Sequence, residues 1–508
     1  MSQAKIALVA FVWLFLLGMG VVIWKLVLQP QQQAEVAQQR SQQEKQAIDA
    51  TQGTSRYRHD LYCGLDSFSG YAVLRSPEFT EQLNRVGIRV NLSDDRADYA
   101  KRMDRLEAGE VQFAAFPIDA LLKVCSQRQR LPATIIALLD ETVGADAMLA
   151  YKQQFPDLDS LNTAQTRIVL VGESPSETLT RLVVRDFDLS DLNGQAIQAV
   201  DSPEKLMGIY RQAKPSGHEV FVTWEPFVSQ LLENDQVHVL VDSSKFSGYI
   251  VDALVVNRDF LLKQPSVVED FLACYFRALS TFREPFKQVE LFLADAKQTG
   301  SALTPAQAER LRQGVRLKNT QENYSHFGLR PDQQLLHVED ILLRISRVLV
   351  ESNVMAQDPT QGQFSKLFYD KALAKLKSDN FLPSEAIRQE NQLSALTESQ
   401  WAELIPVGTL KVPELVFARG TATLTPSSKQ TLDELADKLQ SWPAYYLQVE
   451  GNAASGGNAQ ANLSLAARRA DAAVEYLRGL GVPEARLRAA SGKVGQSRVV
   501  FVLSELPY

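Results

Sequence analysis

Residues 167–186 read RIVLVGESPSETLTRLVVRD, and this stretch indicates the fold of the larger part of the chain. The run Arg167–Val171 predicts a buried strand, and Ser176–Asp186 predicts an amphipathic helix. The turn between them, Gly172–Glu177, offers free backbone N–H groups at the positive end of the helix, which suits anionic or polar ligands. Plain turn formation and helix capping are the simpler alternative for any such turn taken alone.

The same alternation continues on both sides of this stretch, from about residue 57 to 380. Strand-like runs and helices such as Arg96–Ala108 follow one another, which predicts parallel α/β sheets. About 320 residues favour two lobes over a single sheet. Two further turns, Cys63–Tyr71 (CGLDSFSGY) and Asp140–Asp146 (DETVGAD), are expected to open helices after strands. The strand-like runs are 111–116, 134–139 and 220–223, and residues 84–92 are expected to be a helix end followed by a strand.

Composition sets limits on the class of protein. A chain of 508 residues is too long for one core, so two or three domains are expected. The net charge of −7 argues against general nucleic-acid binding. The three cysteines have no metal-like spacing and build no disulfide framework, although one bridge stays open. The five histidines form no HExxH pair, so no metal and no cofactor are expected.

The N-terminal stretch Ile6–Trp24 (IALVAFVWLFLLGMGVVIW) carries no charge. A bilayer core needs about 20 apolar residues as a helix, and a cleavable signal peptide has a shorter apolar core. Residues 1–28 are therefore expected to be an uncleaved transmembrane signal anchor, with Trp24 and Lys25 at the interface. The Gln-rich segment 29–56 is expected to be a solvated stalk.

The order of the turns and strands resembles the substrate-binding proteins of ABC importers, in the group that binds sulfonates, nitrate and thiamine precursors. The resemblance covers about Arg58 to Asn380. It implies a two-lobed type 2 periplasmic binding fold whose cleft closes on a small molecule. Lobe one would comprise 57–148 and 249–380, and lobe two 149–248. The matching stretches include GLDSFSGYAVL, IIALLDETVGADAMLA, IVLVGESPSETLTRLVVRDFDL, VTWEPFVSQLL and GYIVDALVVNRDFL.

The matched turns imply a set of cleft residues. Trp224 would offer a flat stacking wall, although a buried structural tryptophan is the simpler reading, and the Glu225 carboxylate could pair with a cation. The implied ligand-binding residues are Asp66, Ser67, Tyr71, Phe116, Thr142, Asp146, Ser174, Ser176, Trp224 and Glu225.

The charge of the ligand stays open at this point. The acidic residues Asp66, Asp140, Glu141, Asp146 and Glu225 favour a ligand with a cationic part, whereas helix N-termini favour an anionic one. Catalysis is not expected. The enzymes of the same fold that make the thiamine pyrimidine carry a cysteine-rich motif, which this sequence lacks, and no nucleophile–base pair stands out.

A linker is expected at 381–411 and a second domain at 412–508. Strands are predicted at 415–417, 445–450 and 497–503, with helices at 429–441 and 462–480. This β-α-β-α-β order predicts a small α/β sandwich.

The C-terminal stretches LVFARGTATLTPSSKQTLDELADKL and NLSLAARRADAAVEYLRGLGV resemble the OmpA-like peptidoglycan-binding domain. In that family an aspartate and an arginine hold the peptide of peptidoglycan, and Arg469 matches the arginine. The aspartate's place falls near Ala454, with Asn452, Asn458 and Asn462 as polar candidates nearby. Losing this carboxylate should weaken binding by about 1–3 kcal/mol. A protein-contact module is therefore the alternative.

Both resemblances imply a location outside the cytoplasm, so the sequence predicts a single-pass protein of the bacterial inner membrane with its bulk in the periplasm. The predicted function is a solute-binding protein that captures or senses a small polar molecule and reaches the cell wall through its OmpA-like domain. The alternative is a structural or assembly protein that uses the binding fold as a scaffold. The expected partners are a small-molecule ligand, peptidoglycan, and a membrane permease or envelope complex, with no nucleic acid.

Overall fold

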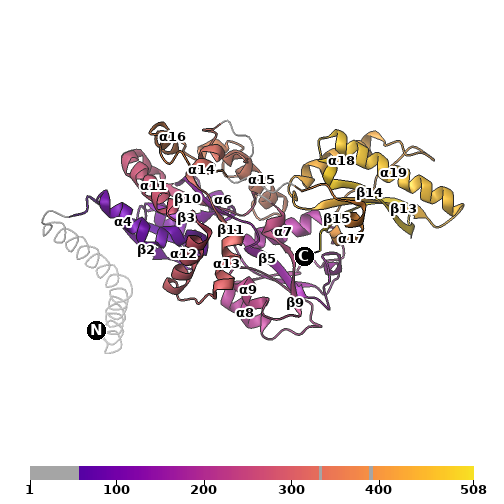
Figure 1. Ribbon diagram of the computed structural model, residues 1–508, viewed down its shortest axis with the longest axis horizontal. Helices are drawn as coiled ribbons and strands as arrows, with labels where there is room; N and C mark the ends of the chain where they lie inside the picture. The colour runs from indigo at the N-terminus through magenta and orange to yellow at the C-terminus, as the bar shows by residue number, and fades with distance from the viewer. Residues whose placement is uncertain (1–55, 247, 331–334, 388–392, 508) are drawn as a thin grey trace, which may run out of the picture. The chain divides into compact units, whose positions relative to one another are not determined.

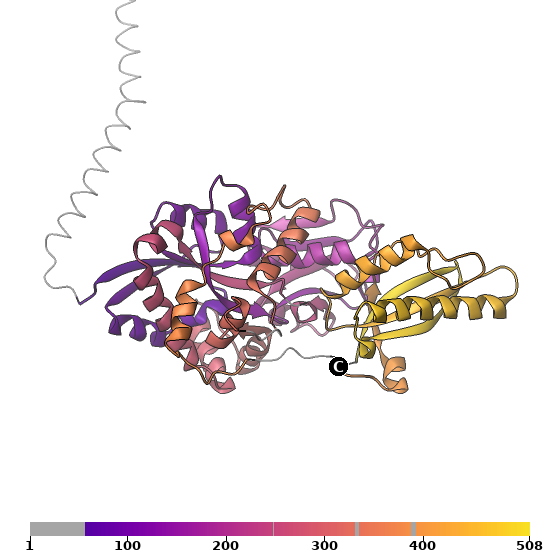
Figure 2. The same cartoon turned by 90° about the horizontal axis from the view of Figure 1, so that it is seen from above.

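The computed structural model describes residues 56–246, 248–330, 335–387 and 393–507. The expected anchor at 1–28 and the stalk up to residue 55 lie outside these residues. Within the described residues, no helix combines the length and the hydropathy needed to cross a membrane. Residues 59–508 form one compact unit, which holds three sheets (Figures 1 and 2).

A six-stranded sheet in the order β11-β4-β10-β3-β1-β2 lies in the first part of this unit. β1 pairs in parallel with β2 and β3, whereas β10 runs antiparallel to both β3 and β4. The expectation of a purely parallel sheet is therefore wrong, because β10 enters from the second sheet in the opposite direction. The strands are β1 His59–Leu65, β2 Ile88–Asp94, β3 Phe113–Pro117, β4 Ala133–Thr142, β10 Val251–Asn257 and β11 Val315–Leu317.

Helices from two distant stretches of the chain cover this sheet (Figure 1). The rings of Phe113 in β3 and Phe271 in α11 stack with centroids 3.8 Å apart, which joins the two stretches in one core. The helices are α3 Ala72–Arg75, α4 Pro77–Arg85, α5 Tyr99–Glu107, α6 Ile118–Ser126, α10 Arg258–Lys263, α11 Pro265–Ser280, α12 Pro285–Gln298, α13 Pro305–Gly314, α14 Thr320–His326, α15 Val338–Glu351 and α16 Lys371–Ser378.

A five-stranded sheet follows in the order β7-β6-β8-β5-β9. β6 spans Arg167–Val171 and α7 spans Pro175–Asp186, so the strand and helix predicted from this stretch are confirmed. β6 is parallel to β7 and β8, and β5 is antiparallel to β8 and β9. The other elements are β5 Asp146–Tyr151, β7 Ile197–Val200, β8 Glu219–Trp224, β9 Val237–Asp242, α8 Pro203–Tyr210 and α9 Phe227–Leu231.

Two segments connect the two sheets and lie against each other. The turn Asp140–Asp146 was expected to open a helix, but it carries the chain from β4 directly into β5. Gly144 has a φ of 106°, a conformation that favours glycine, and its N–H donates to the Ser243 hydroxyl at 2.8 Å. Ser243 lies on the return path from β9 to β10, so both connections are fastened together.

The C-terminal sheet has the order β12-β15-β13-β14, with α18 and α19 side by side along it (Figures 1 and 2). The strand expected at 415–417 is wrong, since only an isolated bridge from Phe417 to Leu424 occurs there. Instead, β12 lies in the expected linker; its Pro406 is typical of an edge strand and weakens the strand signal. The elements are α17 Glu398–Glu403, β12 Ile405–Thr409, α18 Pro426–Leu439, β13 Tyr446–Ala454, α19 Ala459–Gly479, β14 Leu487–Gly495 and β15 Arg498–Glu505.

The C-terminal part is held against α7 through Trp442, which is fully buried. The Trp442 indole N–H donates to Asp186 at 2.8 Å, and its ring lies 5.2 Å from that of Phe187. The Tyr249 and Ser441 hydroxyls add a hydrogen bond of 2.7 Å. Because these contacts come from residues distant in sequence, they fix the C-terminal part to the five-stranded sheet and to the segment that returns from it.

Candidate ligand-binding cleft

A cavity of about 450 Å³ lies between the two larger sheets, beside the two segments that connect them. Its walls come from the ends of β1, β4, β6 and β8, from the two connecting segments and from the first turns of α7 and α8. The lining residues are Asp66, Ser67, Phe68, Tyr71, Asp94, Arg96, Ala97, Tyr99, Pro117, Thr142, Asp146, Val171, Gly172, Ser174, Pro175, Asp201, Ser202, Pro203, Glu204, Trp224, Phe227, Ile250, Asp252 and Thr299.

Most of the residues implied by the sequence lie on this cavity. The structure brings together Asp66, Ser67, Tyr71, Thr142, Asp146, Ser174 and Trp224. Asp66, Ser67, Thr142, Ser174 and Trp224 stand at or just beyond the carboxyl end of a strand. Asp146 is the first residue of β5, and Tyr71 ends the short helix Ser69–Tyr71 that follows β1. The role of these residues in binding stays a prediction.

Three of the implied residues do not line the cavity. Phe116 is buried within β3, with its ring 6.0 Å from that of Tyr99. Ser176 is buried within α7. The Glu225 carboxylate accepts hydrogen bonds from the backbone N–H of Ser229 at 3.1 Å and from its hydroxyl at 2.9 Å. Since this partner lies one helical turn along the chain, Glu225 is satisfied locally.

Several lining residues were not anticipated, above all the aromatic Phe68, Tyr99 and Phe227 and the acidic Asp252. Asp252 could have been predicted as a cleft residue from the sequence, because it is a lone carboxylate within the apolar stretch of β10. The aromatic residues carried none, because their spacing is that of ordinary core positions.

Asp146 is the most unusual side chain of the cavity. Its side chain is almost fully buried, and among the described residues neither carboxylate oxygen has a hydrogen-bond partner. Burial raises its pKa to about 7; the Thr142 hydroxyl, which lies nearby but outside hydrogen-bond geometry, opposes this shift, and the carboxyl groups of Asp119 and Glu225 add to it. A buried carboxylate without a partner is costly, so it indicates a missing ligand group.

Asp252 and Tyr71 form a second polar pair in the wall. The Tyr71 hydroxyl donates to the Asp252 carboxylate, and both side chains are buried. Burial, followed by the neighbouring charge of Asp140, raises the pKa of Asp252 well above its usual range. This carboxyl is therefore occupied by the tyrosine and is less available than Asp146.

Asp66 is balanced by a buried arginine. Arg102 donates to Asp66 at 2.8 Å and from its Nε to Asp95 at 2.7 Å. The Arg75 guanidinium donates to the Asp66 carbonyl at 2.6 Å. The turn after β1 is thereby fixed, and Asp66 has a cationic partner without a ligand, which it shares with Asp95.

Replacing Asp146 with Asn is expected to stabilise the unliganded protein at pH 8 by about 1–3 kcal/mol. With a pKa of about 7 in the folded protein and 3.8 as its ordinary value, Asp146 binds a proton more tightly when folded. Its contribution to stability is therefore present at low pH and lost as the pH rises through 7. At pH 4.5 the gain should shrink to below about 1 kcal/mol.

Denaturant unfolding of wild type and D146N at both pH values measures this difference. The exposed Asp191, which lies outside the cavity, provides the control D191N, expected to change stability by less than about 0.5 kcal/mol at either pH. A pH-independent effect of D146N would show that the carboxyl does not titrate as described.

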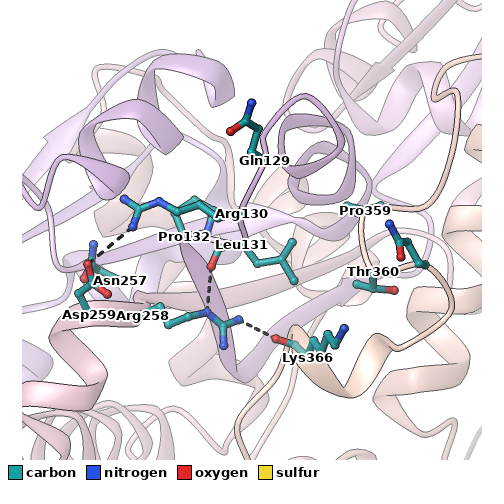
Figure 3. Close-up of a pocket in the computed structure, with 11 residues that line it drawn as sticks. Gln129, Arg130, Leu131, Pro132, Asn257, Arg258, Asp259, Pro359, Thr360 and Lys366 are labelled. Carbon is teal, nitrogen blue, oxygen red and sulfur yellow. Dashed lines mark hydrogen bonds and ion pairs between the residues drawn. The ribbon is translucent and has the colours of Figure 1, made fainter.

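A second cavity of about 410 Å³ opens beside α10 and is more basic (Figure 3). Its central side chain, Arg258, donates to the Leu131 carbonyl at 2.8 Å and the Lys366 carbonyl at 2.6 Å. Arg130 lies 3.9 Å from the Asp259 carboxylate. Because its arginines are already partnered, this cavity is a weaker candidate for a ligand site than the cleft.

The residues implied for peptidoglycan lie at one end of the C-terminal sheet. The Arg469 guanidinium stacks 4.8 Å from the Phe417 ring centre and donates to the Thr421 carbonyl at 3.1 Å. The Asn452 side chain accepts from the Lys493 backbone N–H at 2.6 Å, and the Asn462 amide donates to the Ala454 carbonyl at 3.2 Å. The two asparagines thus support the backbone around the position where the family carries its aspartate.

Comparison with known proteins identifies this C-terminal part. Residues 416–500 match the OmpA family. A peptidoglycan-associated lipoprotein of Rhizobium meliloti is 32% identical over 136 residues, which are 27% of this chain and 74% of that protein. The chain belongs to the OmpA family. A peptidoglycan-associated lipoprotein of Brucella melitensis is 31% identical over 137 residues, 27% of this chain and 78% of that protein, and so also matches the OmpA-family domain.

The remaining part of this OmpA-family chain resembles a different class of solved structure. A periplasmic sulfonate-binding protein from Methylobacillus flagellatus, of a putative sulfonate ABC transporter, aligns with a TM-score of 0.50 and 10% identity. The alignment covers 66% of this chain and 99% of that one. At this identity the likeness concerns the fold alone. The prediction of a substrate-binding-protein fold joined to an OmpA-like domain is therefore confirmed.

Proposed function

We propose that this protein is a solute-binding protein of the bacterial envelope that captures or senses a small polar molecule in the cleft and contacts peptidoglycan through its OmpA-family domain. The observation that carries the proposal is the buried, unpartnered carboxylate of Asp146 in a cavity of about 450 Å³. This volume falls within the range of about 300–1,000 Å³ that small-molecule sites occupy.

The two sheets act as lobes in this proposal, and the connections at 140–146, 242–246 and 248–251 act as hinges between them. A ligand that contacts both walls favours the closed state because those contacts exist only when the walls meet. The proposed function is binding rather than chemistry, which agrees with the likeness in fold to a sulfonate-binding protein. Ile6–Trp24 would anchor the chain in the inner membrane, and a permease or envelope complex would receive the bound molecule.

Native mass spectrometry of the full chain, released from detergent micelles, tests ligand capture. A small molecule that co-purifies and leaves on mild activation is the expected result. A second test is small-angle scattering before and after the molecule is removed, where loss of ligand should enlarge the radius of gyration. An empty protein whose dimensions never change would favour the scaffold alternative, in which the binding fold serves as a structural part.

Replacing Arg469 with Ala is expected to weaken sedimentation of the protein with purified peptidoglycan at least fivefold. The guanidinium is positioned by Phe417 and Thr421, and it is the group that can form a forked pair with a peptide carboxylate. The neighbouring Arg468 is exposed on the same helix, so R468A is the matched control. Equal loss of binding in R468A and R469A would point to non-specific charge attraction, and unchanged binding in R469A would contradict the assigned role.

A further inference from the structure

The cavity wall is rich in negative charge. Its lining carboxylates are Asp66, Asp94, Asp146, Asp201, Glu204 and Asp252, while among the described lining residues Arg96 is the only arginine or lysine. Arg102 shares its positive charge between Asp66 and Asp95, and Tyr71 occupies Asp252. Among the described residues Asp146 has neither kind of partner, so its buried carboxylate is an uncompensated negative charge in the wall.

An aromatic ring lies directly beside that charge. Asp146 in β5 is paired with Trp224 in β8 in the antiparallel register, and both line the cavity. Directly opposed residues of antiparallel strands place their side chains on the same face, with Cβ atoms about 4.5–5.5 Å apart. A carboxylate next to an indole is the combination that attracts an ammonium group, through charge pairing and through the face of the ring.

The helix N-termini on the cavity are poorly suited to an anion. In the first turn of α7, the Glu177 carboxylate accepts from the Glu173 N–H at 3.3 Å, and the Ser174 hydroxyl donates to the Val171 carbonyl at 2.7 Å. α8 has Glu204 in its first turn, and its Ser202 hydroxyl accepts from the Lys205 N–H at 3.4 Å. Carboxylates thus already stand at the positive ends of both helices, where a sulfonate or phosphate would have to bind.

We propose that the ligand of the cleft is a small organic cation, whose ammonium group pairs with the Asp146 carboxylate against the face of Trp224. This inference rests on the proposed function and specifies its substrate class. The aromatic rings of Phe68, Tyr99 and Phe227 supply an apolar wall for the body of such a ligand. Binding satisfies the buried carboxylate and thereby offsets the cost that it imposes on the empty protein.

Thermal-shift and calorimetric titration of the ligand-stripped full chain tests the charge class. The probes are benzylamine and choline as cations, benzyl alcohol as the neutral analogue and benzenesulfonate as the anion. The cations are expected to stabilise the protein, and D146N should raise their dissociation constants at least tenfold. The control D191N should change them less than twofold, because Asp191 is exposed and lies outside the cavity.

The pH dependence of choline binding provides an independent readout, since choline itself does not titrate. The titratable groups that act on Asp146 are Asp119 on α6, Asp140 in β4 and Glu225 after β8. Choline affinity should fall as the pH is lowered below about 7, approaching tenfold per pH unit, because protonation removes the charge that it pairs with. In D146N the affinity for choline should no longer depend on pH in this range.

The possible outcomes distinguish a wrong ligand class from a wrong proposed function. Stabilisation by benzenesulfonate but not by the cations would overturn the cationic ligand while leaving a solute-binding protein. Equal binding of cations by wild type and D146N would overturn the role of Asp146. Failure of every probe, together with an empty protein in native mass spectrometry, would overturn the proposed function itself.

Discussion

Replacing Arg102 with Met is expected to lower the free energy of unfolding by about 3–5 kcal/mol, one of the two largest single-residue effects that we expect in this chain. The Arg102 side chain is fully buried and bridges the carboxylates of Asp66 and Asp95. It also donates to the Ala115 carbonyl in β3. Methionine fills a similar volume but leaves two buried carboxylates without their counter-ion.

Denaturant unfolding at pH 7.5 measures this loss, and Arg105 provides the control. Arg105 lies one turn further along α5 and pairs with Glu110 at 3.4 Å near the surface, so R105M should cost less than about 1 kcal/mol. Arg102 also sets the position of Asp66 in the cleft wall, and R102M should therefore weaken ligand binding as well. Equal stability of the two variants would contradict the description of Arg102 as a buried ionic bridge.

Replacing Trp442 with Ala is expected to destabilise the protein by about 3–5 kcal/mol, because a fully buried indole leaves a large cavity. Trp442 joins the OmpA-family domain to α7 through Asp186 and Phe187, and its ring lies 5.5 Å from that of Phe246. Arg486 supports the loop that carries it, with its guanidinium donating to the Leu439 carbonyl at 2.8 Å.

The variant W442F separates the packing contribution from the hydrogen bond. Phenylalanine keeps a ring in the pocket but removes the donor to Asp186, which should cost about 1–2 kcal/mol. Limited proteolysis provides a second measurement, since W442A should expose the segment that precedes α18 to cleavage earlier than W442F does. Wild-type stability and proteolysis in both variants would show that the two parts are not joined through Trp442.

The strands and helices that were predicted correctly are those whose amino-acid pattern matches their environment in the folded protein. The strand Arg167–Val171 is apolar because it is buried, and the Pro and Ser residues at 174–176 start α7 directly after it. Residues such as Asp66 and Ser174 were placed at the cleft by the resemblance of their turns to the binding-protein family. They follow β1 and β6, which are parallel to neighbouring strands, and the carboxyl ends of parallel strands meet at one edge of their sheet.

Some of the implied residues lie off the cavity because partners or surroundings that the pattern does not reveal satisfy them. Glu225 is bound by Ser229, and Phe116 faces the core inside β3. The turn Asp140–Asp146 has the composition of a helix start but joins two strands of different sheets, since the Ser243 hydroxyl and the partner strands of β5 satisfy its backbone instead.

The sequence by itself determined most of the strands and helices and the gathering of acidic residues at the turns, which follow from apolar periodicity and turn composition acting over a few residues. The binding-protein fold followed by an OmpA-like domain was implied by the resemblance of its stretches to known families. Only the tertiary structure decided that Arg102 pairs with Asp66, that Tyr71 occupies Asp252 and that Asp146 has no hydrogen-bond partner among the described residues. The charge that a buried carboxylate offers to a ligand depends on partners brought near it by folding, and these come from elements distant in the sequence.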